Sequence, residues 1–189
     1  MVKSTRKNRQ TPPAINPSAT PRRKAQLSSI GLRFLAAGYD FMIIIGVSMV
    51  LVGIPLTIAN SALDAMPPKW LQYMLFVSVC YAYFVGLWVK GGTTTGMRPW
   101  NLRVAMVENG EPLTLATASA RFAVLMITWL ALSMTFLYLS GRYTHHTLFF
   151  ISAAIPAISL LCMLISKRRQ PLHDLVAGTG VFRLAKSDA

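Results

Sequence analysis

Acidic residues are scarce in this sequence, which has 6 Asp and Glu against 19 Lys and Arg in 189 residues, a formal net charge of +13. Charged residues make up only 13% of the chain, compared with about 25% in a typical soluble domain. A soluble nucleic-acid-binding domain can be this basic, but it distributes its charges over a folded surface. Here the charges lie between long apolar blocks, which excludes that class and indicates an integral membrane protein.

Cysteine and histidine are also rare, with 2 Cys and 3 His. Cys80 and Cys162 both lie in apolar blocks, so we expect buried thiols rather than a disulfide. No His or Cys set has the spacing of a metal site, and no catalytic triad or pair of carboxylates suggests an active site. The sequence therefore predicts no catalytic residue, no cofactor, no metal and no specific nucleic-acid partner, and we do not expect an enzyme.

Four apolar blocks are long enough to cross a bilayer as helices, since about 18 or more apolar residues can span a hydrocarbon core of roughly 30 Å. They cover residues 34–59, 70–89, 122–139 and 148–165 and contain a single charged side chain, Asp40. The first block is longer than a span requires, so we expect it to tilt or break near Pro55. The sequence predicts an all-α membrane protein, a bundle of four transmembrane helices. Whether the short link at residues 140–147 is a full loop or re-entrant is left open.

The orientation of the bundle follows from its basic residues. With an even number of spans, both termini lie on one side together with the loop at residues 90–121. All of the Lys and Arg residues lie on that side except Lys69 and Arg142. Because short, positively charged loops stay in the cytoplasm, we expect both termini to be cytoplasmic.

The chain is expected to divide into a tail and one membrane domain. Residues 1–30 are polar, basic and rich in proline, so they cannot bury enough surface to fold alone and are predicted to be a disordered cytoplasmic tail. This tail is either a topology anchor or an attachment to anionic lipid or nucleic acid. Residues 31–184 form the transmembrane domain, and residues 185–189 form a second short tail.

Asp40 is the most informative single residue. An aspartate in a spanning helix costs about 2.5–3.5 kcal/mol on insertion scales, so it usually faces the bundle interior and has a partner. Arg33 lies nearly two turns earlier on the same helix face, about 10 Å away along the axis and too far for direct contact. The candidate partners are therefore Arg121, His173 and Lys90. Two roles stay open: a cation- or proton-binding site, and a polar clamp that fixes helix packing.

The loop between the second and third blocks contains two turn signals. A Gly/Thr-rich run ends at Gly96, and the pair Asn109-Gly110 follows an apolar run at residues 102–107. Because Asn-Gly between apolar segments is typical of a hairpin turn, we expect a small cytoplasmic β-hairpin between helices 2 and 3. The Gly/Thr run lacks the Gly-Lys-Ser/Thr ending of a phosphate loop and is interpreted as a turn.

Several of these motifs together resemble the RDD family of bacterial membrane proteins. An Arg opens the first helix, an Asp lies within it, and the tail carries a second Asp in a short motif. These residues are Arg33, Asp40, Gln170, His173, Asp174, Ala177 and Thr179. The middle loop is similar to the family as well, through Thr94, Gly96, Leu102, Arg103, Val104, Asn109 and Gly110. The resemblance covers about residues 31–184.

The resemblance implies a multi-pass protein of the bacterial cytoplasmic membrane that is suspected of transport. It directs attention to Arg33, Asp40 and Asp174, with His173 beside Asp174 as a relay or gate. The supporting positions are Thr94, Gly96, Arg103, Arg121, Gln170 and Thr179. Because four helices do not guarantee a pathway, transport would call for a homo-oligomer in the lipid bilayer.

Two functions are consistent with the sequence. In the first, the protein transports a cation, a proton or a small solute, and Asp40 is the intramembrane carboxylate. In the second, it is a non-transporting accessory or scaffold protein that binds membrane-protein partners, and Arg33, Asp40 and Asp174 form a structural network.

Overall fold

The fold is a set of long helices whose ends meet at a small β-sheet. The computed structural model describes residues 25–63, 66–142, 144–166 and 170–184, so most of the predicted basic tail and residues 185–189 lie outside it. The elements are β1 (Ala25–Leu27), α1 (Ile30–Ser48), the π-helical turn η1 (Met49–Gly53), α2 (Ile54–Leu63), α3 (Lys69–Gly91), the 3-10 turn η2 (Arg98–Trp100), β2 (Leu102–Met106), α4 (Leu115–Leu139), α5 (His146–Ile165), α6 (Leu172–Val176) and β3 (Thr179–Leu184).

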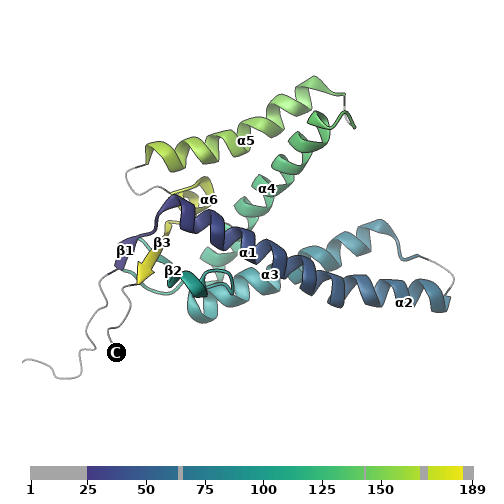
Figure 1. Cartoon of the computed structure of the whole chain (residues 1–189), viewed down its shortest axis with the longest axis horizontal. Helices are drawn as coiled ribbons and strands as arrows, with labels where there is room; N and C mark the ends of the chain where they lie inside the picture. The colour runs from purple at the N-terminus through teal and green to yellow at the C-terminus, as the bar shows by residue number, and fades with distance from the viewer. Residues whose placement is uncertain (1–24, 64–65, 143, 167–169, 185–189) are drawn as a thin grey trace, which may run out of the picture.

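The described part of the chain contains four helical segments that are long and apolar enough to cross a membrane, as predicted. They are Ile30–Ala62, Lys69–Gly91, Leu115–Leu139 and His146–Ile165. They form two hairpins, α1–α2 with α3 and α4 with α5, which diverge from the end that carries the sheet (Figure 1). Many large apolar side chains on these helices are exposed, including Met42, Ile58 and Phe150, as expected of surfaces that face lipid.

The first long helix changes its winding just before Pro55. The backbone N–H of Ile54 donates to Met49 O, five residues back, and η1 covers Met49–Gly53. Proline has no N–H to donate to the preceding turn. The helix accommodates the missing hydrogen bond by a local π turn. The break expected near Pro55 is therefore a π turn inside one continuous helical segment.

The β-structure differs from the predicted hairpin. β2 pairs with β3 from the tail, β3 also pairs with β1, and all pairs are antiparallel in the order β1-β3-β2. The Asn109-Gly110 turn does form, and Met106 N donates to Glu111 O at 3.0 Å. No return strand follows, because Pro112 cannot donate a ladder hydrogen bond and α4 begins at Leu115. The prediction of a local hairpin is wrong, and β2 finds its partner far along the chain.

The sheet also orders the start of the described chain. Ala25–Leu27 pairs with β3, so the structure places a strand where the sequence predicted unstructured tail up to residue 30. Ser28 follows and is 2% exposed, and its hydroxyl donates to Val181 O at 3.1 Å. Segments more than 150 residues apart in the sequence are thereby joined at the base of α1.

The helix α4 begins seven residues before the apolar block that predicted it. Thr114 is its N-cap, with the Thr117 N–H donating to the Thr114 hydroxyl at 3.2 Å, and such caps stabilise the first turn. The extra turns place Arg121 inside the helix rather than ahead of it.

The hydrophobic core lies near the start of α4, where Trp88 of α3 packs with Val104 of β2 and Val181 of β3.

Candidate functional site

Most of the residues singled out from the sequence, together with Tyr83, form two separate groups near the sheet end of the molecule. We call them the Asp174 cluster, which comprises Arg33, Arg121, His173, Asp174 and Thr179, and the Asp40 cluster, which comprises Asp40, Tyr83, Thr94 and Gly96. Both central carboxylates are buried, with 0% of Asp174 and 3% of Asp40 exposed.

Asp174 forms ion pairs with two arginines from different helices. Arg121 Nη2 of α4 lies 2.9 Å from Asp174 Oδ1, and Arg33 Nη1 of α1 lies 3.4 Å from Asp174 Oδ2. Arg121 is only 2% exposed. An isolated buried charge is costly, and the carboxylate of the short helix α6 places one negative charge between the two guanidinium groups.

Hydrogen bonds connect this ion-pair group to the sheet. Arg121 Nη1 donates to the Thr179 hydroxyl at 3.0 Å, and Gln170 Nε2 donates to Thr179 O at 2.7 Å. Arg33 Nη2 donates to Val181 O at 3.2 Å. The cluster thus joins α1, α4, α6 and β3 at one point, and Gln170 and Thr179 of the tail motif take part in it.

An aromatic ring contributes a further contact to Arg121. The guanidinium carbon lies 4.7 Å from the centroid of the Trp88 ring, within the range of a cation–π interaction. Sequence reasoning missed Trp88, because a tryptophan within an apolar block has the same pattern as a packing residue.

His173 lies beside Asp174, and its surroundings favour the neutral imidazole over the charged one. Its Nε2 is 3.5 Å from Asp174 Oδ1, and 17% of its side chain is exposed. Burial, aided by the positive charges of Arg121 and Arg33, lowers the pKa of His173 to about 4, against the opposing effect of Asp174. A histidine with this pKa is a poor proton relay near neutral pH, which argues against that predicted role.

Asp40 is held by neutral donors. The Tyr83 hydroxyl of α3 donates to Oδ1 at 2.6 Å, the Thr94 hydroxyl donates to Oδ2 at 2.5 Å, and the Gly96 N–H donates to Oδ1 at 2.8 Å. In the described part of the chain, no Lys, Arg or His forms an ion pair with Asp40. The hydrogen bonds described for this carboxylate therefore come from neutral groups.

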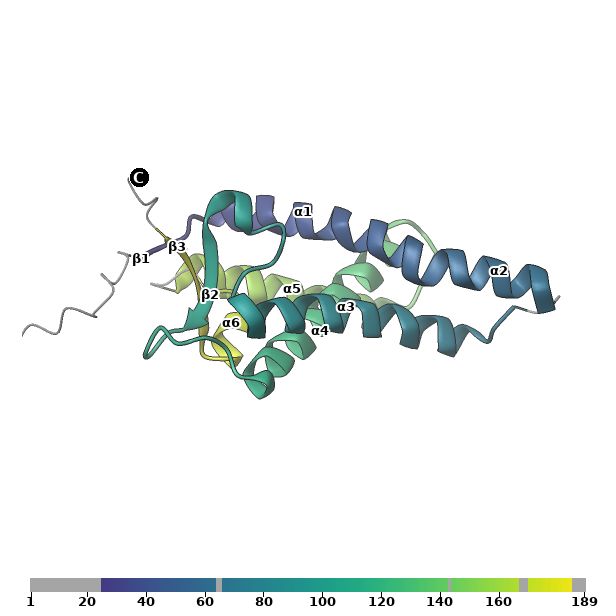
Figure 2. The same cartoon turned by 90° about the horizontal axis from the view of Figure 1, so that it is seen from below.

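Gly96 is required by the close approach of its loop to α1. A Cβ atom at this position would lie 2.8 Å from both the backbone N and Oδ1 of Asp40. Only glycine lets a backbone N–H reach the carboxylate at this distance. The predicted turn at residues 94–96 is thus a cap on Asp40, and the segment that contains it runs along α1 (Figure 2).

The structure therefore separates residues that the sequence analysis grouped together. None of the candidate partners Arg121, His173 and Lys90 contacts Asp40; Arg121 and His173 contact Asp174 instead. The single network of Arg33, Asp40 and Asp174 is replaced by two clusters, because Arg33 turns toward α6 and the sheet while Asp40 faces α3. Tyr83, which sequence reasoning missed, supplies the contact from α3.

Arg103 belongs to neither cluster. It lies in β2 opposite Phe182 of β3, and its Nε has no hydrogen-bond partner. The aliphatic part of Arg103 packs against Gly92, where a Cβ would lie 3.1 Å from Arg103 Cγ. This contact places Arg103 at the junction of α3 and the sheet.

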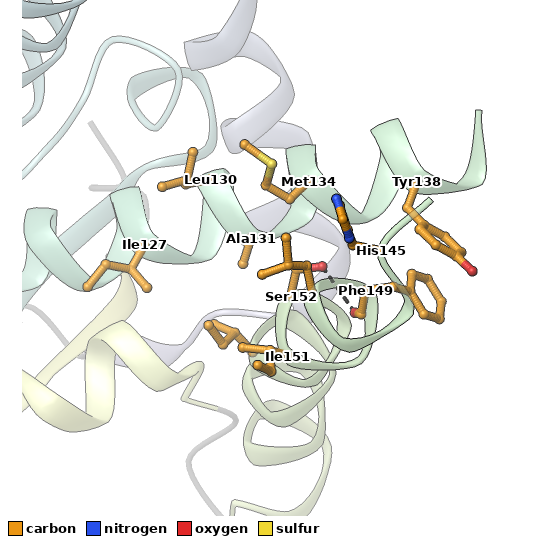
Figure 3. Close-up of a pocket in the computed structure, with 11 residues that line it drawn as sticks. Ile127, Leu130, Ala131, Met134, Tyr138, His145, Phe149, Ile151 and Ser152 are labelled. Atoms are coloured by element: carbon orange, nitrogen blue, oxygen red, sulfur yellow. Dashed lines mark hydrogen bonds between the residues drawn. The ribbon is translucent and has the colours of Figure 1, made fainter. Parts of the chain in front are cut away.

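A pocket of about 220 Å³ lies between α4 and α5, away from both clusters. Figure 3 shows that Ile127, Met134 and Phe149 give it a mainly apolar lining, with Tyr138, His145 and Ser152 as polar members. Ser152 already donates its hydroxyl hydrogen to Phe149 O at 3.1 Å. Among the described residues no group of three His, Cys, Asp or Glu side chains is placed to hold a metal ion.

Four long apolar helices, with buried polar clusters at one end, define a multi-pass membrane protein. Residues 27–178 match the model of the RDD family, and the chain belongs to that family. No curated protein and no solved structure matches the chain.

Proposed function

We propose that this protein transports a proton, a cation or a small solute across the bacterial cytoplasmic membrane, and that Asp40 is the carboxylate that takes up the proton or cation. The observation that carries the proposal is the environment of Asp40, which is 3% exposed and has no ion pair within the described residues. Asp174, by contrast, has two arginines.

The reason lies in the cost of an unbalanced charge. A carboxylate without a counter-charge in a low-dielectric environment is expensive, and uptake of a proton or cation removes that cost. The hydroxyl groups of Tyr83 and Thr94 can donate or accept hydrogen bonds, so they suit either charge state of Asp40. Asp174 gains nothing comparable, because its charge is already balanced.

A transport pathway would continue along the face of α1 that carries Asp40. Ile44, Ser48 and Val52 are buried on this face, and the Ser48 hydroxyl has no hydrogen-bond partner. A homo-oligomer would enclose the remainder of the path. The distribution of Lys and Arg supports an orientation with both termini in the cytoplasm.

The second candidate is a non-transporting accessory protein that binds other membrane proteins. It is favoured by the Asp174 cluster, which fastens four elements together at one end, as a scaffold requires. Under this alternative the Asp40 cluster is also structural, a clamp between α1, α3 and the intervening loop.

Flux in proteoliposomes distinguishes the two functions. Purified wild type and Asp40→Asn are reconstituted at equal density, and proton, sodium, potassium and lithium fluxes are recorded. A matched control is Glu111→Gln, which removes an exposed carboxylate outside the helices. We expect flux in the wild type and in Glu111→Gln, and none in folded Asp40→Asn. Equal flux in Asp40→Asn would contradict the role of Asp40, and no flux in any sample would favour the accessory function.

A further inference from the structure

The loop between α3 and β2 covers the carboxylate of Asp40. Thr94 is 0% exposed, and the hydroxyl of Thr94 and the N–H of Gly96 both donate to Asp40. Tyr83 closes the remaining side from α3. The described groups that cover Asp40 therefore come from the helix α3 and one short loop.

The ends of this loop are anchored independently of Asp40. Gly92 accepts a hydrogen bond from Val104 N at 2.6 Å, and Met97 O accepts one from Leu102 N at 3.2 Å. These contacts fasten the loop to the end of α3 and to β2. The segment between these anchors is residues 93–96, and its members Thr94 and Gly96 hydrogen-bond to the carboxylate.

The three donors suit an ionised carboxylate better than a protonated one. An ionised carboxylate only accepts hydrogen bonds, whereas a protonated one must also donate. The hydroxyls of Tyr83 and Thr94 can turn to accept, but the Gly96 N–H cannot reverse its role. Protonation also removes the charge that makes these hydrogen bonds roughly twice as strong as neutral ones.

Few charged groups compete for Asp40. Tyr83 is the titratable side chain in contact with it. On the neighbouring elements, Lys90, Arg98 and Arg103 make no ion pair with Asp40 within the described residues, and Arg33 on the same helix pairs with Asp174. A change in the charge of Asp40 therefore alters mainly its hydrogen bonds with the loop.

We propose that residues 93–96 form a lid over Asp40, held closed by the ionised carboxylate and released when Asp40 takes up a proton or a cation. This inference rests on the proposed function, since it assigns to the same carboxylate both the uptake of the ion and the control of access. The sheet stays in place while the lid moves, because the anchors at Gly92 and Met97 do not involve Asp40.

Hydrogen–deuterium exchange of the protein in lipid nanodiscs tests the lid. In folded Asp40→Asn we expect amides of residues 93–96 to exchange about tenfold faster than in wild type, while those of β2 and β3 keep their rates. Glu111→Gln is the control and should leave the lid unchanged. Wild-type exchange rates for the lid in Asp40→Asn would overturn the proposal, as would an equal acceleration throughout the sheet.

A second pair of variants tests the lid with Asp40 intact. Gly96→Ala places a Cβ against the α1 backbone and should accelerate exchange of the lid, whereas Gly86→Ala has nothing within 4 Å and should not. A lid that stays protected in Gly96→Ala would contradict the proposal.

Measurements of flux separate the lid hypothesis from the transport hypothesis. If Asp40→Asn loses flux while exchange in the lid is unchanged, only the lid hypothesis is overturned. If the lid opens in a protein that shows no flux, only the transport hypothesis is overturned.

Discussion

Two buried aspartates lie near the same end of this molecule and have opposite surroundings. Asp174 contacts two guanidinium groups, Arg121 at 2.9 Å and Arg33 at 3.4 Å. Asp40 contacts two hydroxyl groups and one backbone N–H. Among the residues that the structure describes, Asp174 forms ion pairs with basic side chains and Asp40 forms none.

The difference shows that burial alone does not define the role of a carboxylate. A carboxylate between two arginines stabilises the junction of the segments that supply them, and its own protonation would leave buried positive charge behind. A carboxylate among neutral donors can change its charge without that penalty. We therefore propose a structural role for Asp174 and the exchange of an ion for Asp40.

The largest effect is expected from Asp174→Asn. The change leaves the Arg121 guanidinium, 2% exposed, without its carboxylate, and breaking a buried pair in this way costs about 3–5 kcal/mol. Thermal unfolding in detergent and the yield of monodisperse protein measure the loss. Glu111→Gln serves as the control, and a stability equal to wild type would remove the structural role of Asp174.

Acid should weaken the Asp174 cluster through His173. Its pKa is about 4 in the folded protein and near 6.5 when unfolded, so the unfolded state binds more protons between these values. Stability should therefore fall as the pH decreases from about 6.5 to 4, by up to about 3 kcal/mol. In His173→Gln this part of the pH dependence should disappear. An identical slope in wild type and variant would show that His173 is not held neutral.

Asp40→Asn should be less destabilising than Asp174→Asn. The substitution strands no buried cation, and its cost is that of mismatched hydrogen bonds, about 1–3 kcal/mol. The two variants are compared by thermal unfolding in the same detergent and at the same pH. A larger loss for Asp40→Asn than for Asp174→Asn would reverse the assignment of roles.

The smallest effect is expected from Tyr83→Phe. It removes one of three hydrogen bonds to Asp40 and leaves the ring contact with Phe84, whose centroid lies 5.2 Å away. The expected cost is about 0.5–1.5 kcal/mol, measured as a shift in the thermal midpoint. The control is Tyr73→Phe, on an exposed tyrosine of the same helix, which should show no shift.

The helices were predictable from the sequence because length and hydropathy determine them locally. The partner of β2 was not, since the Asn109-Gly110 signal is local while the true partner, β3, lies more than 70 residues further along the chain. The start of α4 was missed for a different reason. The prediction placed the start of the helix at the start of the apolar block, whereas α4 begins directly after its N-cap at Thr114.

The sequence predicted which residues belong to the candidate site better than it predicted which of them contact one another. Family resemblance indicated Arg33, Asp40 and Asp174, and helix geometry correctly separated Arg33 from Asp40. The partners of Asp40 were not accessible to the same reasoning, because charge suggests a basic residue while the observed donors are hydroxyls and a backbone N–H. Such donors leave no distinctive pattern in a sequence.

The most direct test of the contrast is an infrared titration of the carboxyl groups in the reconstituted protein, with and without sodium, potassium or lithium. We expect the wild type to have a buried carboxyl signal that appears on acidification or changes with a cation. This signal should be missing from folded Asp40→Asn and retained in Glu111→Gln. Identical spectra for wild type and Asp40→Asn would show that Asp40 does not change its charge state and would contradict the account.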